Sequence, residues 1–520
     1  MAITTATMET ISAPSMPILC AVILMSYWAS IVIYRLYFHP LARFPGPRRA
    51  AATHLYEIAW DYFGDGGYLF EVQKMHQKYG PIVRVNPLEL SILDPDFYAE
   101  LYVTGSVRRT EAFPHFGDGM DFNGSHGMTV DHDLHRRRRK PMEPFFSRQG
   151  VSRIEPKLSE LVCTLVGRLQ DYRGTGKVIR LDHALSALAG DVISNICMDD
   201  PPASFLHDPD FNPHWFELFH TLIRSMPIFM NFSWIIKIVR LIPESILRKL
   251  DPRSQMFRDW RIMSENHIAE AKNRKLSDGS LSKSEGYSRS NTVFDQLVNS
   301  DMSESDLSVE RLASEAQVLM GAGTVTTARS MDHLTVHILR NSRVQDRLEA
   351  ELKEVMADFP ETLPSWKTLD QLPYLQACIK EGLRLSHGIM HRLPRCSPDV
   401  ALQYKEWTIP RGTPVGMSAY YMHTDPEVYI NPFEFRPERW LGEINPNMHR
   451  NYVPFTKGSR NCLGINLAYA EMSMVMAALF CPKGPKLKLF ATDERDADPA
   501  CAFLLPLPKL DSKGIRVLVE

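Results

Sequence analysis

The chain has 520 residues, 44% of them hydrophobic and 23% charged, and its formal net charge is −2. Such a composition is typical of a globular protein with ample apolar material for a large core. The 59 basic and 61 acidic side chains nearly cancel, which excludes a general nucleic-acid binder. Eight scattered cysteines without a C-x-x-C pair argue against a zinc ribbon and suit reduced thiols in the cytosol.

The first apolar segment lies near the N-terminus. Residues 17–34 carry no charged side chain, and about 17–25 such residues cross the hydrocarbon layer of a membrane. Glu9 is the only charged residue before the segment, whereas four arginines follow it between positions 35 and 49. Because positive charge favours the cytoplasmic side, we expect the body of the chain to face the cytosol. The alternative, a cleaved signal peptide, lacks its basic leading region.

These features predict a chain of four parts. No long linker divides the part after the prolines, so one large body is expected despite its length. The parts are a short lumenal N-terminus (1–16), a transmembrane anchor (17–34), a Pro-rich connector (35–50) and the body (51–520).

Most of the body has helical periodicity. Residues 81–93 alternate as a hairpin of strands does, whereas residues 150–200, 309–340 and 343–358 give the clearest helical pattern. The fold class expected is therefore mainly α with a small β-rich lobe. Ser-rich residues 276–290 predict an exposed loop.

One apolar segment leaves two interpretations open. Residues 222–247 mix isoleucine, phenylalanine, methionine and tryptophan with few charges. They could lie on the membrane surface or form a lid, as amphipathic segments do. Burial in the core is the alternative, and the sequence does not decide between the two.

A basic segment follows the predicted hairpin. It begins at His135 and runs HRRRRK. His135 and Arg139 are four residues apart, which places both on one helix face and suits two donors to carboxylates. A solvated basic helix is the alternative interpretation. The remaining basic residues would face outward and could dock an acidic electron donor.

Two further patterns lie on predicted helices. Gly321 to Thr327 read GAGTVTT within the longest helix, where small residues and threonine hydroxyls can distort the helix locally and leave room for a small ligand. Glu381 and Arg384 share a helix face and can pair. Either pattern alone fits ordinary helix packing or a surface ion pair.

The most specific pattern is FTKGSRNCLG, from Phe455 to Gly464. Its glycines let the backbone approach a flat ligand. A thiolate on iron needs backbone N–H donors, and the positive end of the following helix points at Cys462. Arg460 can reach an acidic edge of the ligand. A lone cysteine is usually a small buried hydrophobe, but this pattern predicts a metal ligand.

The loop resembles the signature of the cytochrome P-450 superfamily, in which a cysteine thiolate holds haem iron. The resemblance implies that Cys462 is the ligand of haem b and that Phe455 and Gly464 border the cofactor. It further implies that its carboxylates are held by basic side chains, namely His135, Arg139, Arg395 and Arg460. Arg392 is an alternative to Arg395, which fits the family spacing better.

Other family segments appear in the same order. FRPERW at 435–440 resembles the segment whose arginine, Arg439 here, joins Glu381 and Arg384 in a buried triad. Thr326 matches the threonine that assists O–O cleavage, with Thr327 beside it. Val325 stands where the family usually has an acid, which leaves proton delivery to water or to the two threonines.

The resemblance implies a P-450 fold behind a transmembrane helix, in a fungal microsomal monooxygenase of secondary metabolism, similar to trichodiene oxygenases. The expected reaction hydroxylates or epoxidises an apolar terpenoid or polyketide with dioxygen. Electrons would come from NADPH through NADPH-cytochrome P-450 reductase. The expected location is the endoplasmic reticulum membrane, single-pass, with a cytosolic catalytic domain. The alternatives are a haem-thiolate isomerase or dehydratase and a non-catalytic haem-binding protein.

The substrate should lie on the side of the iron opposite the sulfur. The walls of its pocket are expected from five segments: 113–128, 222–234, 316–325, 388–394 and Phe503–Leu504.

Overall fold

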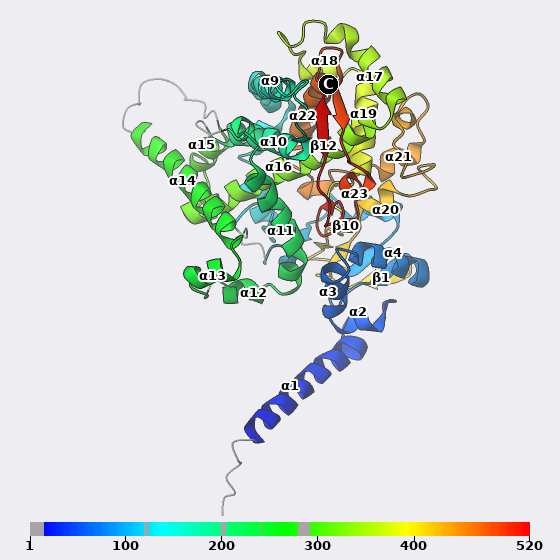
Figure 1. Cartoon of the computed structure of the whole chain (residues 1–520). Coiled ribbons are helices and arrows are strands. Elements are labelled where there is room, and N and C mark those ends of the chain that lie inside the picture. The colour runs from blue at the N-terminus through cyan, green and yellow to red at the C-terminus, as the bar shows by residue number, and fades with distance from the viewer. Residues whose placement is uncertain (1–14, 119–121, 123, 199–203, 240, 279–291) are drawn as a thin grey trace, which may run out of the picture.

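The computed structural model describes residues 15–118, 122, 124–198, 204–239, 241–278 and 292–520. Helix α1 (Ser15–Ile33) leaves the body as an isolated rod and continues as a short π-helix, η1 (Tyr34–Phe38) (Figure 1). Met16–Phe38 form an apolar helix of 23 residues with a mean hydropathy of 2.1 and no buried part. At 1.5 Å per residue it spans roughly 34 Å, enough for a ~30 Å hydrocarbon core. The predicted anchor is thus long and apolar enough to cross a membrane.

The connector after η1 lies against the body. Leu41 and Phe44 are buried, and the Phe44 ring stacks on Trp407 with centroids 4.9 Å apart. The buried Arg84 donates from Nη1 to the carbonyl oxygen of Arg35 at 2.8 Å. The connector is therefore bound to the body at Arg35 and again at Phe44, which fixes the direction in which α1 leaves the body.

Small sheets form the β-rich lobe and its extensions. In the largest sheet, β1 and β2 pair antiparallel with Val83 opposite Ser91, which confirms the predicted hairpin. Its strand order is β1 (Ile82–Arg84), β2 (Leu90–Ile92), β8 (Val415–Gly416), β5 (Arg395–Cys396) and β3 (Glu111–Ala112). The other strands are β4 (Ile179–Arg180), β12 (Arg516–Val519) and β9 (Leu487–Leu489) in one sheet, and the hairpins β6 (Leu402–Tyr404) with β7 (Trp407–Ile409) and β10 (Cys501–Ala502) with β11 (Pro506–Leu507).

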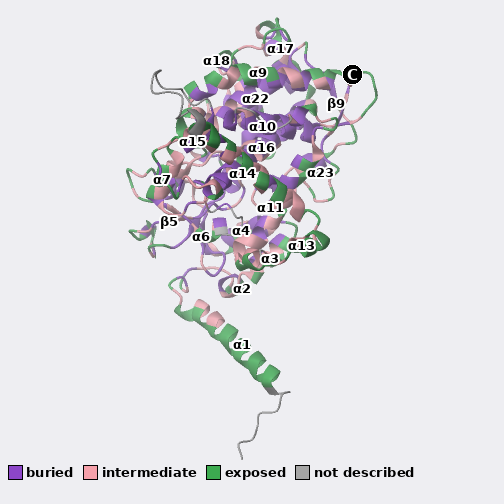
Figure 2. Cartoon of the chain, turned by 90° about the vertical axis from the view of Figure 1, so that its left-hand side faces the viewer, coloured by how far each residue is buried: buried purple, intermediate pink, exposed green. Residues whose placement is uncertain are grey.

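Helices make up most of the body, and the longest, α16 (Val309–Leu339), runs through its centre. It packs against α10 (Leu181–Cys197), α19 (Pro373–Leu385) and α22 (Ile465–Phe480), and this centre is the buried part of Figure 2. The helices before α16 are α2 (Arg48–Ala52), α3 (Leu55–Tyr62), α4 (Tyr68–Tyr79), α5 (Tyr98–Leu101), α6 (Pro114–Asp118), α7 (His132–Arg139), α8 (Glu143–Phe146), α9 (Arg148–Gln170), α11 (Pro213–Asn231), α12 (Trp234–Val239), α13 (Glu244–Leu250), α14 (Ser254–Asp278) and α15 (Val293–Val298). Those after it are α17 (Ser342–Val355), α18 (Trp366–Leu369), α20 (Ala419–His423), α21 (Pro446–Asn451) and α23 (Glu494–Ala497).

The mainly α fold class is confirmed, and so are the helices predicted at 309–340 and 343–358. The stretch 150–200 holds two helices, α9 and α10, because Gly174 and Gly176 adopt φ of 69° and β4 intervenes. Of the loop predicted at 276–290, the first residues end α14 and the others lie outside the described residues.

The apolar segment 222–247 is divided between the two interpretations. Ile223 and Met226 of α11 are buried in the core. Beyond α11, Trp234 and Leu241 are 56% and 82% exposed. The core interpretation therefore holds for α11, while α12 and the residues after it present apolar side chains to the outside.

Candidate active site

The loop before α22 carries the predicted cysteine. Gly458 has a φ of 78°, and a Cβ added there would lie 2.4 Å from the carbonyl oxygen of Val103. Ser459 donates its backbone N–H to the same oxygen at 3.1 Å. Cys462 donates its own N–H to the Phe455 carbonyl at 3.0 Å. Because only glycine fits at 458, the loop can lie directly on the backbone of residues 102–103, which positions Cys462.

The side chain of Cys462 faces internal space. It is exposed, as is only Cys20 of α1 among the other cysteines, yet it lies deep enough that burial raises the pKa of its thiol. The backbone N–H of Gly464 and the charge of Arg139 act the other way and lower this pKa. Gly464 is the N-cap of α22, whose dipole also favours an anionic sulfur. The pKa of the thiol stays above its ordinary value on balance, but an accessible sulfur beside an N–H donor and a positive charge can serve as a metal ligand.

His135 on α7 has one nitrogen without a partner. Its Nδ1 donates to the His126 carbonyl at 2.8 Å, whereas the buried Nε2 has no hydrogen-bond partner among the described residues. Burial and the charge of Arg460 lower the pKa of this imidazole to about 3. A carboxylate at Nε2 would stabilise the imidazolium form, in which both nitrogens donate. The orphaned nitrogen therefore fits an anionic oxygen.

Arg395 and Arg460 bring two cations close together. Burial and the charge of Arg395 lower the pKa of Arg460 to about 9. Arg460 donates to the backbone carbonyls of Thr129 at 2.7 Å and Val130 at 2.6 Å, and Arg395 donates to the carbonyls of the two residues before it. Within the described part of the chain, neither forms an ion pair with an acidic side chain. Their charges are thus available to an anionic ligand.

Arg139 lies beside the cysteine loop. It donates from Nη1 to the Asn461 carbonyl at 2.6 Å and from Nη2 to the Asn461 side chain at 3.1 Å. Its Nε is 3.1 Å from Glu143. These contacts fix the residue next to Cys462 and bring a positive charge to the sulfur, while a contact of Arg139 with a haem carboxylate stays a prediction.

The alternative to Arg395 is occupied elsewhere. Arg392 is buried and its Nη2 lies 2.7 Å from Glu57 and 3.3 Å from Glu89. This leaves Arg395 as the arginine of its segment that is free of acidic partners among the described residues.

The predicted threonines of α16 differ in exposure. Thr326 donates from Oγ1 to the Ala322 carbonyl at 2.8 Å. Its side chain is partly exposed, whereas that of Thr327 is buried. Gly323 lies against Ile193 of α10, where an added Cβ would meet the side chain at 2.7 Å. Helix α16 is continuous from Val309 to Leu339, and the hydroxyls of Thr324 and Thr326 bond to carbonyls four residues before them, so the expected local distortion stays a prediction. Gly323 allows α10 and α16 to pack closely.

Val325 occupies the usual acid position in an apolar setting. It packs with Ile223 of α11 and with Phe503 and Leu505, which belong to the turn between β10 and β11. A carboxylate at this position would be surrounded by hydrocarbon, so its charged form would be disfavoured.

Two cavities include the β10–β11 turn in their linings, and the second also includes α16. One has about 340 Å³ of space, part of it open to solvent, and is lined by Phe116, Met230 and Phe503, with Asp61 and other acidic side chains. The other holds about 360 Å³, and its apolar lining includes Phe216, Phe219, Ile223, Val325 and Leu505. All five predicted wall segments contribute a residue to these cavities, namely Phe116, Met230, Val325, His391 and Phe503. No residue of the cysteine loop 455–464, all of which is described, lines either one.

The predicted buried triad is confirmed. Glu381 Oε1 lies 2.8 Å from Arg384 Nη2 and 2.7 Å from Arg439 Nε, and Trp440 donates to Oε2 at 2.9 Å. Arg439 and Trp440 come from the short 3-10 helix η4 (Pro437–Trp440). Although burial alone would raise it, the two arginines hold the pKa of Glu381 below its ordinary value.

His423 connects this triad to the cysteine loop. Its carbonyl accepts from Arg384 Nη1 at 2.7 Å, and its Nε2 accepts from the backbone N–H of Val453 at 3.0 Å. Burial and the charge of Arg384 lower the pKa of His423 to about 3, so Nε2 remains an acceptor. The triad therefore fixes the backbone just before the loop.

A second buried network was missed by sequence reasoning. Glu315 of α16 accepts from the backbone and ring of His126 and lies 2.5 Å from Arg311. These partners hold the pKa of Glu315 below its ordinary value although burial opposes this. Since the His126 carbonyl binds His135, the network orients His135. The one sequence signal for this network was Glu315 itself, an acidic residue on an otherwise apolar face of the predicted helix.

These side chains fit an iron porphyrin. An accessible sulfur, an unpartnered imidazole nitrogen and two guanidinium groups without acidic partners match its metal and its two carboxylates. Gly464 leaves room, because the only atom within reach of an added Cβ is the Cys462 sulfur at 4.0 Å.

Residues 58–481 match the family model of cytochrome P-450, and the chain belongs to this family. It is a P-450 monooxygenase, which uses haem b and electrons that a redox partner passes on from NAD(P)H.

Relatives from fungi match nearly the whole chain. A fusicoccadiene C-8 hydroxylase of Phomopsis amygdali is 67% identical over 489 residues, which cover 94% of this chain and 93% of the relative. An enzyme of the same name from Alternaria brassicicola is 63% identical over 507 residues, 97% of this chain and 96% of its own. The cytochrome P-450 monooxygenase oblB of Aspergillus clavatus is 53% identical over 494 residues, 95% of each chain. The expectation of a fungal monooxygenase of secondary metabolism is confirmed, and nothing favours the isomerase or the non-catalytic alternative.

Proposed function

We propose that the chain hydroxylates fusicoccadiene or a closely related diene hydrocarbon, at the carbon named in its relatives, with Cys462 as the iron ligand. The observation that carries the substrate is the identity of 67% over 94% of the chain to a fusicoccadiene C-8 hydroxylase. The apolar lining around Val325 and Phe503 supports a hydrocarbon substrate.

In this proposal the sulfur side of the site binds the cofactor. Cys462 ligates the metal, while His135, Arg395 and Arg460 hold the carboxylates and Phe455 and Gly464 border the ring. Arg139 holds the loop and adds positive charge beside the sulfur. When bound, the haem activates dioxygen so that one oxygen atom enters a C–H bond and the other leaves as water.

On the substrate side, Thr326 is the proposed proton donor. Its hydroxyl is bonded to the Ala322 carbonyl and can rotate toward the open face. Thr327 is buried beside it and would act by supporting that part of α16. In this proposal Val325 and Phe503 keep water away from the reacting carbon, so the proton reaches the oxygen through the Thr326 hydroxyl.

The surface supports membrane attachment. We propose that α1 anchors the chain, single-pass, in the endoplasmic reticulum membrane with the catalytic domain in the cytosol. Helices α12 and α13 lie at the end of the body from which α1 leaves (Figure 1). Their region exposes Trp234 and Leu241, which suits the interfacial layer of a bilayer.

The proposed electron donor is NADPH-cytochrome P-450 reductase. Arg136, Arg137 and Lys140 are exposed on or next to α7, the helix whose Arg139 contacts the cysteine loop. This basic surface suits an acidic partner and brings it near the sulfur side of the site.

The test supplies fusicoccadiene to microsomes that contain the full chain and a fungal reductase. With NADPH and oxygen we expect a product with one added oxygen atom, identified as the C-8 alcohol by mass spectrometry and NMR. The reduced, carbon-monoxide-bound protein should show the red-shifted Soret band of a thiolate ligand. Protein with that band that leaves fusicoccadiene unchanged would overturn the substrate assignment and leave the family intact.

The ligand assignment is tested by Cys462→Ser, with Cys163→Ser as the matched control. We expect the red-shifted band to disappear in Cys462→Ser and to remain in Cys163→Ser. Retention of the band in Cys462→Ser would overturn the assignment of the sulfur ligand.

A further inference from the structure

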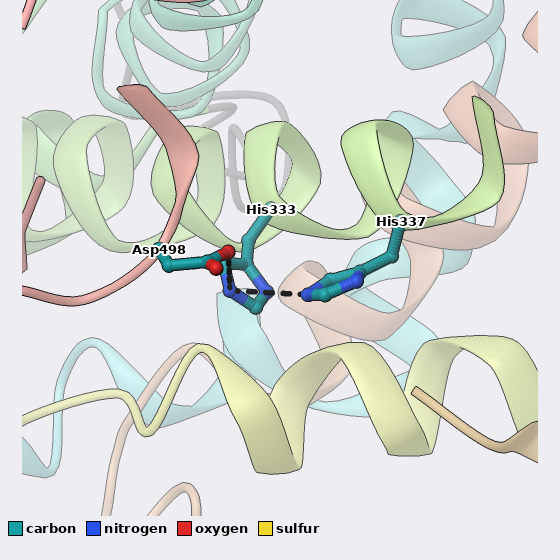
Figure 3. A group of neighbouring side chains, drawn as sticks. All are labelled: His333, His337 and Asp498. Carbon is teal, nitrogen blue, oxygen red and sulfur yellow. Dashed lines mark hydrogen bonds and ion pairs between the residues drawn. The ribbon is translucent and has the colours of Figure 1, made fainter. Parts of the chain in front are cut away.

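A second group of metal-binding side chains lies outside the site described above. His333 and His337 are on α16, about two turns after Thr326, and their Nε2 atoms are 3.3 Å apart. Asp498 follows α23, with Oδ1 3.8 Å from His333 Nε2. The three ligand atoms all lie within 4.8 Å of one another. Figure 3 shows both imidazole rings on one side of α16, with the carboxylate reaching them from another segment.

The spacing suits a tetrahedral metal ion. Zinc binds imidazole nitrogen and carboxylate oxygen at about 2.0–2.2 Å, so neighbouring ligand atoms of a tetrahedron are roughly 3.3 Å apart. With sides of 3.3 and 3.8 Å and a third side of at most 4.8 Å, a point equidistant from the three atoms lies no more than about 2.4 Å from each. Shifts of a few tenths of an ångström therefore close the site.

The protonation states also suit a metal. Burial lowers the pKa of His333 well below its ordinary value, and burial with the charge of Arg340 lowers that of His337 to about 4. Both rings are then neutral at pH 7, which is the form that binds metals. The buried Oδ1 of Asp498, the oxygen nearest His333, has no hydrogen-bond partner among the described residues.

We propose that His333, His337 and Asp498 bind one zinc-type divalent ion, with water as the fourth ligand. The side chain of Asp498 is 41% exposed, which gives the ion and the water a path from solvent. The ion would join α16, which carries Thr326, to the segment that leads from α23 into β10 and the Phe503 turn. It would thus hold together two elements that line the cavity around Val325 and Leu505.

Two nearby charges, Arg329 and Arg340, oppose the ion, and Arg340 provides a test of opposite sign. Arg340 Nη1 lies 3.9 Å from Asp498 Oδ1, where it competes with a cation for the same oxygen. Its side chain is 26% exposed and can turn into solvent. Removing this charge should strengthen metal binding, whereas removing a ligand should weaken it.

The experiment uses the full-length, haem-loaded protein in detergent, freed of metal by a chelator and titrated calorimetrically with zinc chloride. We expect one site, an affinity at least about 10-fold weaker in His337→Ala and in Asp498→Asn, and a tighter site in Arg340→Gln. His449→Ala, which removes an exposed histidine from α21, should leave the affinity unchanged. The carbon-monoxide spectrum verifies that each variant is folded.

X-ray absorption spectroscopy at the zinc edge of the zinc-loaded wild type identifies the ligands. We expect only nitrogen and oxygen neighbours at about 2.0–2.2 Å, with the signature of two imidazoles. The proposal is overturned if the wild type binds no zinc, if sulfur is among the ligands, or if Asp498→Asn binds zinc as tightly as the wild type. Asp498→Asn carries the test alone if His337→Ala does not fold.

Discussion

The two sides of the site are built in different ways. On the sulfur side, the loop 455–464 lies on the backbone of residues 102–103, and Glu381, Arg384 and His423 fix the chain just before it. On the substrate side, Val325, Ile223 and Phe503 meet through apolar contacts alone. The first side depends on backbone geometry and paired charges, and the second on side-chain volume.

This difference separates what defines the family from what selects the substrate. A backbone contact under a glycine and a buried ion triad tolerate few replacements. Apolar contacts tolerate many replacements of similar volume. A chain can therefore keep its cofactor chemistry while the residues around Val325 change the shape of the substrate cavity.

The largest expected effect comes from breaking the ion triad. Glu381→Ala leaves Arg384 and Arg439 buried without their acid, which should lower the free energy of unfolding by about 3–5 kcal/mol and reduce the yield of haem-loaded protein. Unfolding in guanidinium, followed by circular dichroism, measures the change. The control Glu160→Ala removes an exposed ion pair with Lys157 and should cost at most about 1 kcal/mol. Equal losses in both variants would show that burial of the triad has no special weight.

The next effect tests the backbone contact with a pair of glycines. Gly458 and Gly174 both have positive φ, 78° and 69°, but an added Cβ meets the Val103 carbonyl only at Gly458, whereas nothing lies within 4 Å at Gly174. Gly458→Ala should destabilise the fold by about 2–4 kcal/mol and lower haem content, and Gly174→Ala by about 1 kcal/mol. If the two variants lose the same stability, backbone strain alone explains the glycine at 458.

A smaller effect comes from pH on the sulfur side. His423 has a pKa of about 3 in the folded chain, below its ordinary 6.5. Between these pH values the unfolded chain binds more protons at His423 than the folded chain does. The contribution of His423 to the free energy of unfolding is therefore constant above about pH 6.5. Below that pH it falls by up to about 1.4 kcal/mol per pH unit. Unfolding midpoints between pH 7 and 5 should fall less steeply in His423→Gln than in the wild type. The exposed-site control His449→Gln should keep the wild-type slope.

The smallest effect concerns the substrate side. Val325→Asp places a carboxyl among apolar side chains and should draw water into them, so the fraction of NADPH used for product should fall about two-fold. Val325→Thr keeps the volume without an ionisable group and should fall less. The product formed per NADPH consumed is the measurement. An unchanged ratio in Val325→Asp would remove position 325 from the reaction.

Features that are contiguous in the sequence could be predicted, and long-range pairs could not. The cysteine loop, the hairpin at 81–93 and the basic face of α7 were all visible in single stretches. Glu315 and His126 are 189 residues apart, and Arg392 and Glu57 are 335 residues apart. Nothing local marks such partners, because the cation that pairs with each of these buried acids is brought beside it only by the tertiary fold. The close approach of Gly323 to Ile193 likewise depends on how α10 and α16 meet.

The contacts that hold the connector against the body have a consequence for how a hydrophobic substrate reaches the enzyme. Phe44 stacks on Trp407, and Arg84 binds the Arg35 carbonyl. These contacts restrict rotation of the body relative to α1. If α1 crosses a bilayer, the tilt of α1 therefore sets the orientation of the catalytic domain relative to the membrane. The same face of the catalytic domain would then always lie toward the membrane in which a hydrophobic substrate dissolves.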